Sequence, residues 1–359
     1  MKILHITAME PLSPNSGIPA VLKQLTDAQN AIPSVDSFVL SLKAEVNEIG
    51  SPYFFSLGEN SVRAFLNNYT PDVAILHSFF HVEYIGAVRA LIKAGIQFYI
   101  EPHGSFGRQA MKKSTLKKRI ANATVFRQQI KESIGYIFTN KAELKDAIYR
   151  TNNDLVIPNG VCPNIIRSSK MKTEDSFSNP TLYFLGRFDV HHKGLDYLFD
   201  SLDILENEKQ SIKINIYGTG NDKQVKYVND RIKNYSYIKA TNCGTIYGEK
   251  KKRALESCNI LILTSRYEGV PMTVLDGLSY GNPCIVTPGT NVSDEVSENL
   301  IGWHSELSPN IIAETIIKAT NEYKINGKKY YTRCKEYVLN HYSWEKIAED
   351  SISKLSRKV

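Results

Sequence analysis

The stretch that decides the fold is residues 262–287, ILTSRYEGVPMTVLDGLSYGNPCIVT. It opens with an apolar run that is typical of a buried strand, and 284–286 at its end form a second such run. Between them, Pro271 suits the first position of a helix over 272–280, because its missing N–H is not needed there. Gly281 then suits the end of this helix. Strand, loop, helix and strand in this order predict a parallel α/β sheet.

The loop before this helix has the chemistry of a ligand site. Gly269 lets a ligand approach the backbone closely. The backbone N–H groups around 270–273, apart from Pro271 which has none, could bind a phosphate, helped by the helix dipole. The carboxylates of Glu268 and Asp276 flank the loop and can accept hydrogen bonds from sugar or ribose hydroxyls. Spacing alone favours a simpler interpretation, in which Glu268 caps the helix and Asp276 is a surface residue.

The residues themselves closely resemble the signature of the retaining nucleotide-sugar glycosyltransferases of the GT-B fold, family 4 (glycosyl transferases group 1). That signature is a glutamate, seven residues, a second glutamate, then G-x-P and an apolar strand. Here the second acid is Asp276, one methylene shorter. The resemblance implies that Glu268 lies near the donor sugar, with a catalytic role, and that Asp276 holds the ribose. It also implies that Gly269, Val270 and Pro271 contact the donor.

Length and composition are compatible with this family. The chain has 359 residues, enough for two domains with sizeable cores. No stretch approaches the ~20 apolar residues of a membrane span, and the apolar N-terminal stretch is too short for a signal peptide. The five cysteines are scattered and include no C-x-x-C pair, which argues against a disulfide framework or a zinc site. We therefore expect a cytoplasmic bacterial protein, and its net charge of +7 suggests only an acidic partner.

The N-terminal part predicts a first, acceptor-side domain over 1–162. It begins with a strand over 2–7, a loop that contains Gly17, and a helix over 18–28. In an α/β sheet this connection is a usual place for a ligand, and the family has a glycine-containing loop here that faces the donor. An ordinary strand–helix connection would explain Gly17 equally well.

Two histidines follow predicted strands, where active sites of α/β sheets collect. His103 lies in P-H-G after the strand 97–100 and matches a family motif. The resemblance implies that it contacts the donor sugar or the reaction centre, as a catalytic residue. His77, in H-S-F-F-H after the strand 72–76, is expected to line the acceptor side. A satisfied structural histidine is the alternative for each.

Residues 108–131 carry eight basic side chains and no acidic one. A solvated basic helix would explain this composition. We favour a patch that contacts anionic lipid headgroups or a pyrophosphate-linked acceptor, at ~1 kcal/mol per basic residue. Its members are Lys112, Lys113, Lys117 and Lys118. No recognition motif or aromatic interleaving supports nucleic acid as a partner, so we expect peripheral contact with the inner face of the cell membrane.

The first domain is expected to end near I-P-N-G-V at 157–161, which resembles a family marker. The polar segment 163–180 is typical of a linker. A second, nucleotide-sugar-binding domain is expected over 181–339. The last helix, about 340–359, resembles the family's element that packs back on the first domain.

The second domain contains further candidates for donor binding. Arg187 in G-R-F-D and Lys193 in K-G resemble the family's phosphate-binding pair, since Arg offers a bidentate fork and Lys a point charge. Gly218 in G-T-G follows a predicted strand and is expected to line the nucleotide side. The adjacent residues His191 and His192 are not expected to bind a metal.

The resemblance implies the fold class α/β, and within it the GT-B fold of two Rossmann-like domains with parallel sheets facing a central cleft. The function is retaining transfer of a hexose from a nucleotide-diphosphate sugar to a hydroxyl of a glycan or lipid-linked glycan, in surface polysaccharide biosynthesis. A UDP-sugar is favoured as donor and GDP-mannose is next. The chain lacks an Asp-x-Asp triplet near a strand end, so no metal or other cofactor is expected. The alternatives are a sugar-nucleotide epimerase of the same architecture and an inactive scaffold homologue in a polysaccharide assembly complex.

Overall fold

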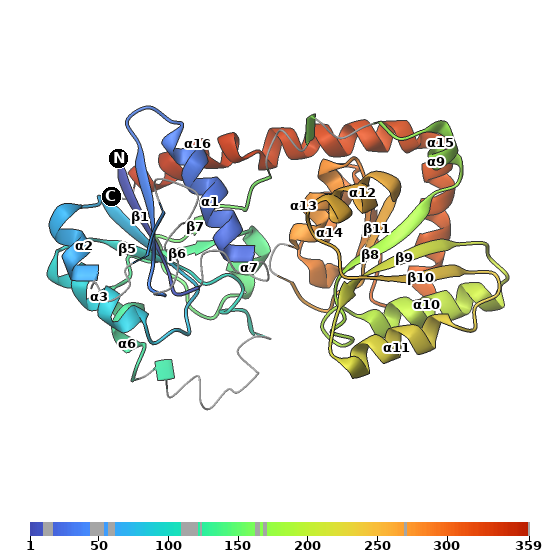
Figure 1. Ribbon diagram of the computed structural model, residues 1–359, viewed down its shortest axis with the longest axis horizontal. Coiled ribbons are helices and arrows are strands. Elements are labelled where there is room, and N and C mark those ends of the chain that lie inside the picture. Colours follow the sequence, from blue (N-terminus) through green and yellow to red (C-terminus); the bar gives the residue numbers. More distant parts are fainter. Residues whose placement is uncertain are drawn as a thin grey trace. The chain divides into compact units, whose positions relative to one another are not determined.

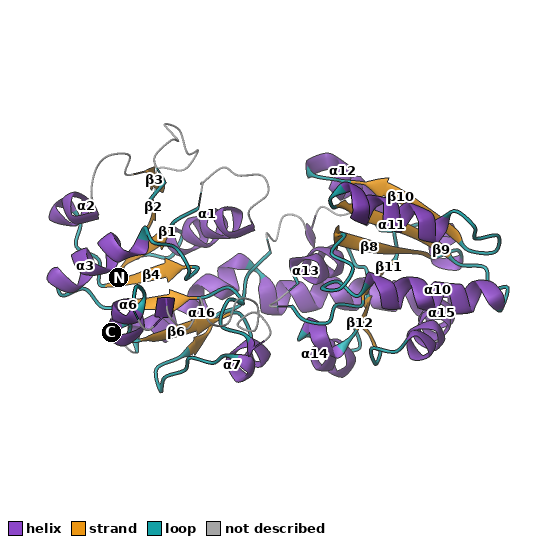
Figure 2. Ribbon diagram, turned by 90° about the horizontal axis from the view of Figure 1, so that it is seen from below, coloured by secondary structure: helices purple, strands orange, loops and turns teal. Residues whose placement is uncertain are grey.

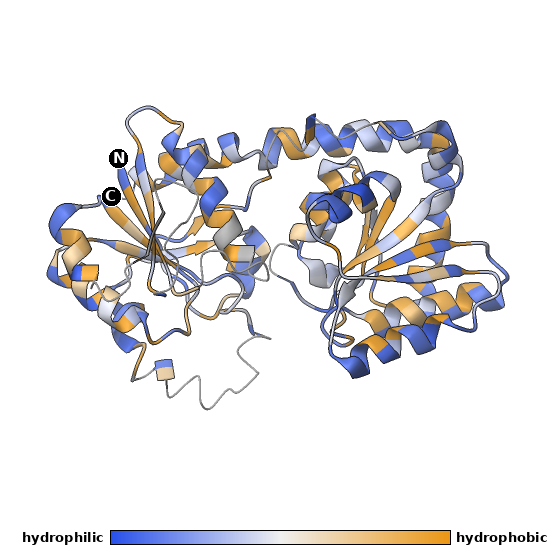
Figure 3. Ribbon diagram, in the orientation of Figure 1, coloured by the Kyte–Doolittle hydropathy of each residue, from blue (hydrophilic) through white to orange (hydrophobic). Residues whose placement is uncertain are grey.

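The computed structural model describes residues 1–9, 17–43, 54–56, 62–108, 121–122, 124–161, 166–167, 171–268 and 271–357. The chain divides into two compact units, Met1–Gly160 with Trp344–Val359 and Val161–Ser343. Each unit is a parallel sheet with helices packed on it (Figure 1). Apolar residues concentrate in the strands and on the helix faces that cover them (Figure 3).

The first unit contains a seven-stranded sheet of order β3-β2-β1-β4-β5-β6-β7. Its strands are β1 (Lys2–Thr7), β2 (Asp36–Ser41), β3 (Phe54–Ser56), β4 (Val73–His77), β5 (Phe98–Glu101), β6 (Gly135–Phe138) and β7 (Leu155–Val156). The helices are α1 (Gly17–Asn30), α2 (Val62–Asn68), α3 (Tyr84–Lys93), α6 (Arg127–Glu132), α7 (Lys141–Asp146) and α16 (Trp344–Ser356). All neighbouring strands pair in parallel. Their carboxyl ends therefore meet at one edge of the sheet, which positions the residues that follow β1, β4 and β5.

The C-terminal helix α16 belongs to the first unit and packs against α1 (Figure 1). The Trp344 indole donates a hydrogen bond of 2.5 Å to Gln24 Oε1 in α1. A Cβ atom at Gly160 would lie 2.6 Å from the same indole, so only glycine lets the chain pass beneath Trp344. The Lys354 ammonium donates to the carbonyl of Val156 at 2.8 Å. These contacts fix the last helix on α1 and on the segment 156–160 that ends the first part of this unit.

The second unit contains a six-stranded parallel sheet of order β10-β9-β8-β11-β12-β13 (Figure 2). Its strands are β8 (Thr181–Arg187), β9 (Lys213–Thr219), β10 (Lys239–Gly244), β11 (Ile260–Leu263), β12 (Cys284–Val286) and β13 (Gly302–His304). The helices are α9 (Glu174–Ser178), α10 (Leu195–Asn207), α11 (Asp222–Ile232), α12 (Gly248–Ser257), α13 (Met272–Ser279), α14 (Ser293–Glu298) and α15 (Pro309–Tyr342), with a 3-10 turn η1 (Pro288–Thr290). Every residue of β11 and β12 is buried, as expected for inner strands covered on both faces.

Two segments differ from the sequence-based expectation. The segment 163–180, assigned to a linker, contains α9, whose Phe177 is buried against the Tyr323 ring at 5.8 Å. Its described part therefore contributes to the core of the second unit. The sequence also predicts separate helices over 308–323 and 330–355, and the break between them lies at Asn326, where α15 has a kink with non-helical φ and ψ of −117° and 15°. The second predicted helix is itself divided, because α15 ends before Ser343 and α16 begins at Trp344. A Cβ at Gly327, next to the kink, would lie 2.3 Å from the Phe177 ring, so α15 needs glycine where it packs on α9.

Two elements of the second unit, α11 and β13, were not predicted. Helix α11 begins with a capping box in which the side chains of Asn221 and Gln224 each accept the other's backbone N–H. This pattern is readable in the sequence, since it is a usual helix start. In the described part of the chain, no helix combines the length and apolarity needed to cross a membrane.

Candidate active site

In the second unit, polar side chains gather beyond the carboxyl ends of β8 and β11. Lys193 lies in the loop after β8, and Ser265 and Glu268 lie in the loop after β11. The Lys193 ammonium is 2.5 Å from Glu268 Oε1, and the Ser265 hydroxyl donates to the same oxygen at 2.6 Å. The Lys193 and Glu268 side chains are only 12% and 10% exposed. Two residues predicted for different roles, phosphate binding and sugar binding, thus form one cluster.

The glycine of the K-G pair is required by the approach of the two loops. Gly194 has a φ of +61°, and a Cβ atom there would lie 1.9 Å from the carbonyl oxygen of Thr264. The Thr264 hydroxyl donates to the Gly194 carbonyl at 2.9 Å. Only glycine combines this backbone conformation with so close an approach. The contact therefore sets the position of the neighbouring Lys193 relative to the loop after β11.

Arg266 strengthens the same junction from the outside. Its guanidinium donates to both carboxylate oxygens of Asp196, at 2.9 and 2.6 Å, and to the carbonyl of His191 at 2.6 Å. Partial burial acts against ionisation of Asp196, but the hydrogen bonds and charge of Arg266 hold its pKa below the ordinary value. Bidentate pairing of this kind is geometrically specific. Sequence reasoning missed this pair, because Arg266 and Asp196 are 70 residues apart.

His192 also lies at this junction. Its ring stacks on Tyr267, with centroids 4.3 Å apart, and its Nε2 donates to the Tyr267 carbonyl at 2.8 Å. Burial lowers the pKa of His192, although Glu268, with Oε2 at 3.9 Å from Nε2, opposes this. The side chain of His192 is therefore committed to holding the loop that carries Glu268.

Asp276, the second acid of the signature, lies in α13 and pairs with a residue that the sequence analysis did not select. The Lys251 ammonium of α12 is 2.5 Å from Asp276 Oδ2, and both side chains are partly exposed. Lys251 lies in the run E-K-K-K-R at 249–253. The run signalled a basic helix face, but nothing in it showed which lysine faces α13.

The remaining donor-side candidates are placed as follows. Arg187 is exposed at the end of β8 and, within the described ranges, makes no ion pair. A Cβ at Gly218 in β9 would lie 1.9 Å from the carbonyl oxygen of Gly186 in β8. The close approach of these two strands therefore requires glycine at position 218. Pro271 is buried and precedes the first residue of α13 as its N-cap. Gly269 and Val270 lie outside the described residues.

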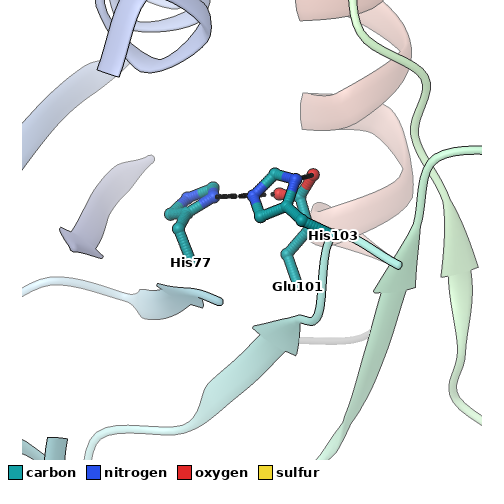
Figure 4. A group of neighbouring side chains, drawn as sticks. All are labelled: His77, Glu101 and His103. Carbon is teal, nitrogen blue, oxygen red and sulfur yellow. Dashed lines mark hydrogen bonds and ion pairs between the residues drawn. The ribbon is translucent and has the colours of Figure 1, made fainter. Parts of the chain in front are cut away.

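In the first unit, His77 and His103 lie together at the ends of β4 and β5, with Glu101 between them in sequence (Figure 4). His77 Nδ1 is 3.2 Å from His103 Nε2 and 3.1 Å from Glu101 Oε2. His103 Nδ1 is 3.6 Å from Glu101 Oε1. The His77 side chain is 1% exposed, and those of Glu101 and His103 are 9% and 13% exposed. His103 is therefore the most exposed side chain of the three.

The backbone at this place is unusual. His103 has a φ of +47° and Ser78, which follows His77, has a φ of +81°. Such conformations are sparsely populated by non-glycine residues and persist where the surroundings over-determine them. Here Glu143 of α7 helps, because its carboxylate accepts hydrogen bonds from Gly104 N at 2.6 Å and from Thr139 N at 2.8 Å.

Burial dominates the electrostatics of this cluster. It lowers the pKa of His77 to about 3, and lowers the pKa of His103 against the opposing effect of Glu101. It raises the pKa of Glu101, an effect that His103 reduces. The histidines are therefore neutral at physiological pH. Among the residues that the structure describes, these three form a group whose potential ligand atoms lie within 4.8 Å of one another. A proton or a metal ion could be held between them.

The other first-unit candidates are less defined. Gly17 is the first residue of α1, and the loop before it lies outside the described part. The four lysines of the basic patch, at 112–118, also lie outside it.

Two Rossmann-like units, each with a parallel sheet and residues gathered at the strand ends, define the GT-B fold, and solved structures of that fold agree. The Anabaena protein HepE in complex with UDP has a TM-score of 0.73 at 14% identity, covering 99% of this chain and 100% of that one. At this identity the similarity shows the fold alone. The expected fold class is thus confirmed.

The sequence comparisons name the family. The family model described as glycosyl transferases group 1 matches residues 168–341, nearly all of the second unit, and this part of the chain belongs to that family. Lipopolysaccharide 1,6-galactosyltransferase of Escherichia coli is 29% identical over 196 residues, which cover 50% of this chain and 52% of the relative. A Methanocaldococcus jannaschii protein, the uncharacterized glycosyltransferase MJ1607, is 23% identical over 235 residues, covering 60% and 58%. The chain thus spans between half and three fifths of these two relatives.

Proposed function

We propose that this chain is a retaining glycosyltransferase, a hexosyltransferase that takes a sugar from a nucleotide-diphosphate sugar and passes it to a hydroxyl of a glycan or lipid-linked glycan in surface polysaccharide synthesis. A UDP-sugar is the favoured donor and GDP-mannose is next. The family of the second unit and the galactosyltransferase relative support transfer of a sugar. The UDP bound to the fold neighbour HepE supports a uridine donor.

The observation that carries the proposal is the Lys193–Ser265–Glu268 cluster at the carboxyl edge of the second sheet. A lysine and an exposed Arg187 at the end of β8 supply positive charge for a diphosphate leaving group. The Glu268 carboxylate, which is paired with Lys193, can accept hydrogen bonds from sugar hydroxyls. Asp276 supplies a further acceptor for ribose hydroxyls.

A hydroxyl of the sugar or of the acceptor would contact His103 of the first unit, whereas His77, whose side chain is 1% exposed, would orient the His103 ring. Burial lowers the pKa of His103, so its neutral ring can donate or accept a hydrogen bond. The leaving phosphate would accept the proton of the attacking hydroxyl, with attack on the face that the phosphate leaves. In this mechanism positive side chains and the start of α13 stabilise the diphosphate, and no metal ion takes part.

Thermal shift against nucleoside diphosphates and nucleotide sugars, without added metal, tests the proposal. A ligand at about 100 times its dissociation constant stabilises a protein by ~2.7 kcal/mol, which is readily detected. Stabilisation by one nucleotide and its sugar is the expected result and identifies the donor. Stabilisation only when a divalent ion is added would contradict metal independence. No response to any of them would favour the scaffold alternative, and conversion of a donor sugar without acceptor would favour an epimerase.

A further inference from the structure

A pocket of about 270 Å³ lies at the amino edge of the second sheet, where α9 leads into β8 (Figure 1). Three lysines from three elements line it. Lys213 is the first residue of β9, Lys239 is the first residue of β10, and Lys324 lies in α15. A single water needs only about 10–15 Å³ of such space, so the pocket has room for a polyatomic ligand.

This pocket is separate from the candidate donor site. Strand β9 has seven residues, so its two ends lie roughly 20 Å apart at the usual rise per residue. Lys193 and Glu268 follow the carboxyl ends of β8 and β11, whereas Lys213 begins β9 at the opposite edge of the same parallel sheet. A ligand in the pocket therefore does not occupy the donor site.

The pocket concentrates like charges. Lys213 and Lys239 are register partners on the parallel strands β9 and β10. Such partners lie about 4.8 Å apart, and their side chains leave the same face of the sheet. Like charges at this separation repel each other. Lysine side chains are long enough to turn apart, yet both line the same pocket, and Lys324 adds a third charge from α15.

The described residues supply no counter-charge to these lysines. No acidic side chain among them lines the pocket, and none forms an ion pair with its three lysines. Acids on the neighbouring elements have other partners: Glu174 of α9 pairs with Lys328, and Glu206 of α10 accepts from the backbone N–H groups of 236–238. Glu208 lines a different pocket. Three positive charges therefore face a space that an anion would neutralise.

Uncharged donors complete the lining. The Asn179 amide donates one hydrogen to Asp175 Oδ1 at 3.0 Å, which leaves its second N–H for a ligand. The Ser211 hydroxyl supplies another donor. The Thr320 hydroxyl donates to the Ile316 carbonyl at 2.7 Å and can only accept from a ligand. The rest of the described lining is aliphatic, with no aromatic ring on which a nucleotide base could stack.

This chemistry suits a phosphate group. A lysine ammonium is a point charge that binds phosphate oxygens without demanding a planar partner. Three of them are balanced better by a group with two or more negative charges than by a phospholipid diester, which carries one. We propose that the pocket binds a free anion with a multiply charged phosphate group, such as inorganic phosphate, pyrophosphate or a sugar phosphate. The inference does not rest on the proposed function, because no residue of the pocket takes part in that function.

The test is calorimetric titration of the full chain with inorganic pyrophosphate at fixed ionic strength. All proteins carry Lys193→Ala, which removes the lysine proposed to bind the donor diphosphate. We expect pyrophosphate to bind this parent, and to bind at least 10-fold more weakly when three glutamines replace the lysines of the pocket. This pocket variant carries Lys213→Gln, Lys239→Gln and Lys324→Gln. Amide NMR of the parent should place the largest shifts at 211–213 and 239.

A matched control variant loses the same net charge elsewhere on the second unit and should bind pyrophosphate like the parent. Its substitutions are Lys226→Gln, Lys233→Gln and Lys318→Gln, at exposed lysines that form ion pairs with acidic residues. Without anion, the pocket variant should have a Tm no lower than the parent, because like-charge repulsion is removed. Pyrophosphate should then raise the Tm of the parent and of the control variant but not that of the pocket variant.

Two results would overturn the proposal. The first is pyrophosphate binding of equal strength in the parent and in a folded pocket variant, since the anion would then bind elsewhere. The second is the absence of binding by both pyrophosphate and phosphate. If in that case the three glutamines also weaken flotation with phosphatidylglycerol vesicles, the ligand is a lipid headgroup and the assignment to a free anion is wrong.

Discussion

The Lys193 ammonium and the Glu268 carboxylate form an ion pair 2.5 Å long between residues 75 positions apart in the sequence. One residue follows β8 and the other follows β11, which are adjacent strands of the second sheet. Without ligand, Glu268 neutralises the lysine that is proposed to bind the diphosphate. A bound diphosphate would share or replace this carboxylate as the partner of Lys193, and the sugar would meet a Glu268 that is already oriented by Ser265.

We expect Lys193→Ala and Glu268→Ala each to lower kcat/KM for sugar transfer by about 100-fold or more, because each removes a charge aimed at the reacting groups. Lys226→Ala is the matched control, since Lys226 forms an exposed ion pair with Asp230 on α11. It should leave transfer unchanged. Tm and circular dichroism establish whether each variant is folded. Near-normal turnover in a folded Lys193→Ala or Glu268→Ala protein would exclude that residue from the mechanism.

Asp276 is expected to bind the ribose hydroxyls of the donor. Asp276→Ala should weaken UDP binding about 10-fold or more, since hydrogen bonds to charged groups contribute about 1.5–3 kcal/mol. The decisive comparison uses 2′,3′-dideoxy-UDP, which lacks those hydroxyls and should bind wild type and variant equally. Lys251→Met leaves Asp276 in place and should weaken UDP far less. Equal weakening of UDP and its dideoxy analogue by Asp276→Ala would show that the residue does not contact the ribose.

Gly218 is expected to be required for the spacing of β8 and β9. Because a Cβ would lie 1.9 Å from the Gly186 carbonyl oxygen, the strands would have to move apart. We expect Gly218→Ala to destabilise the protein by about 1–3 kcal/mol, as overpacking of a core does. Gly86→Ala in α3 is the control, because nothing lies within 4 Å of its added Cβ, and it should stabilise by about 0.5–1 kcal/mol. Denaturation of both variants checks the two signs, and an unchanged stability of Gly218→Ala would show that the strand pair tolerates the added atom.

Much of the fold could be predicted from the sequence, because local signals and global architecture agree. The apolar runs of β1, β4, β5, β8 and β11 lie within a residue or two of their predicted limits. Helix α13 begins at Met272 as its proline suggested. The predicted break between 323 and 330 falls at the kink of α15 at Asn326, whereas the break at Ser343 was not predicted.

The candidate site was predictable only in part. Motifs identified Lys193, Glu268, His77 and His103 one by one. Each was expected near a strand end, because active sites of parallel α/β sheets collect at the carboxyl ends of the strands. Other side chains of the site were not predictable, because Lys251 and Arg266 lie in ordinary polar helix or loop sequence and act through side-chain contacts. The clearest omission is His5 of β1, whose Nδ1 lies 2.8 Å from His77 Nε2. A histidine inside an otherwise apolar strand has to find a buried partner, and that signal was present in residues 2–7.

The basic patch at 112–118 lies outside the described residues, and its role stays a prediction. We expect the wild type to float with liposomes that contain anionic lipid and not with neutral ones. A variant with Lys112, Lys113, Lys117 and Lys118 replaced by glutamine should float less, since each lysine near an anionic surface contributes ~1 kcal/mol. Glutamine replacement of Lys223, Lys226, Lys233 and Lys318, all in the second unit, controls for net charge. Equal flotation of the wild type and the patch variant would exclude this segment as the contact.

Acid should destabilise the first unit through its buried histidines. Burial lowers the pKa of His5 and of His77 to about 3, whereas in the unfolded chain each binds a proton near its ordinary pKa of about 6.5. Between these values the unfolded state binds more protons than the folded state, so the free energy of unfolding falls as the pH falls below about 6.5. Trp344 reports on this unit once Trp303→Phe removes the other tryptophan. In that background, His5→Gln should reduce the pH slope by up to one proton, about 1.4 kcal/mol per pH unit. His341→Gln, at an exposed position in the second unit, is the control and should leave the slope unchanged. An unaltered slope in His5→Gln would mean that His5 is already charged in the folded protein, in spite of its burial.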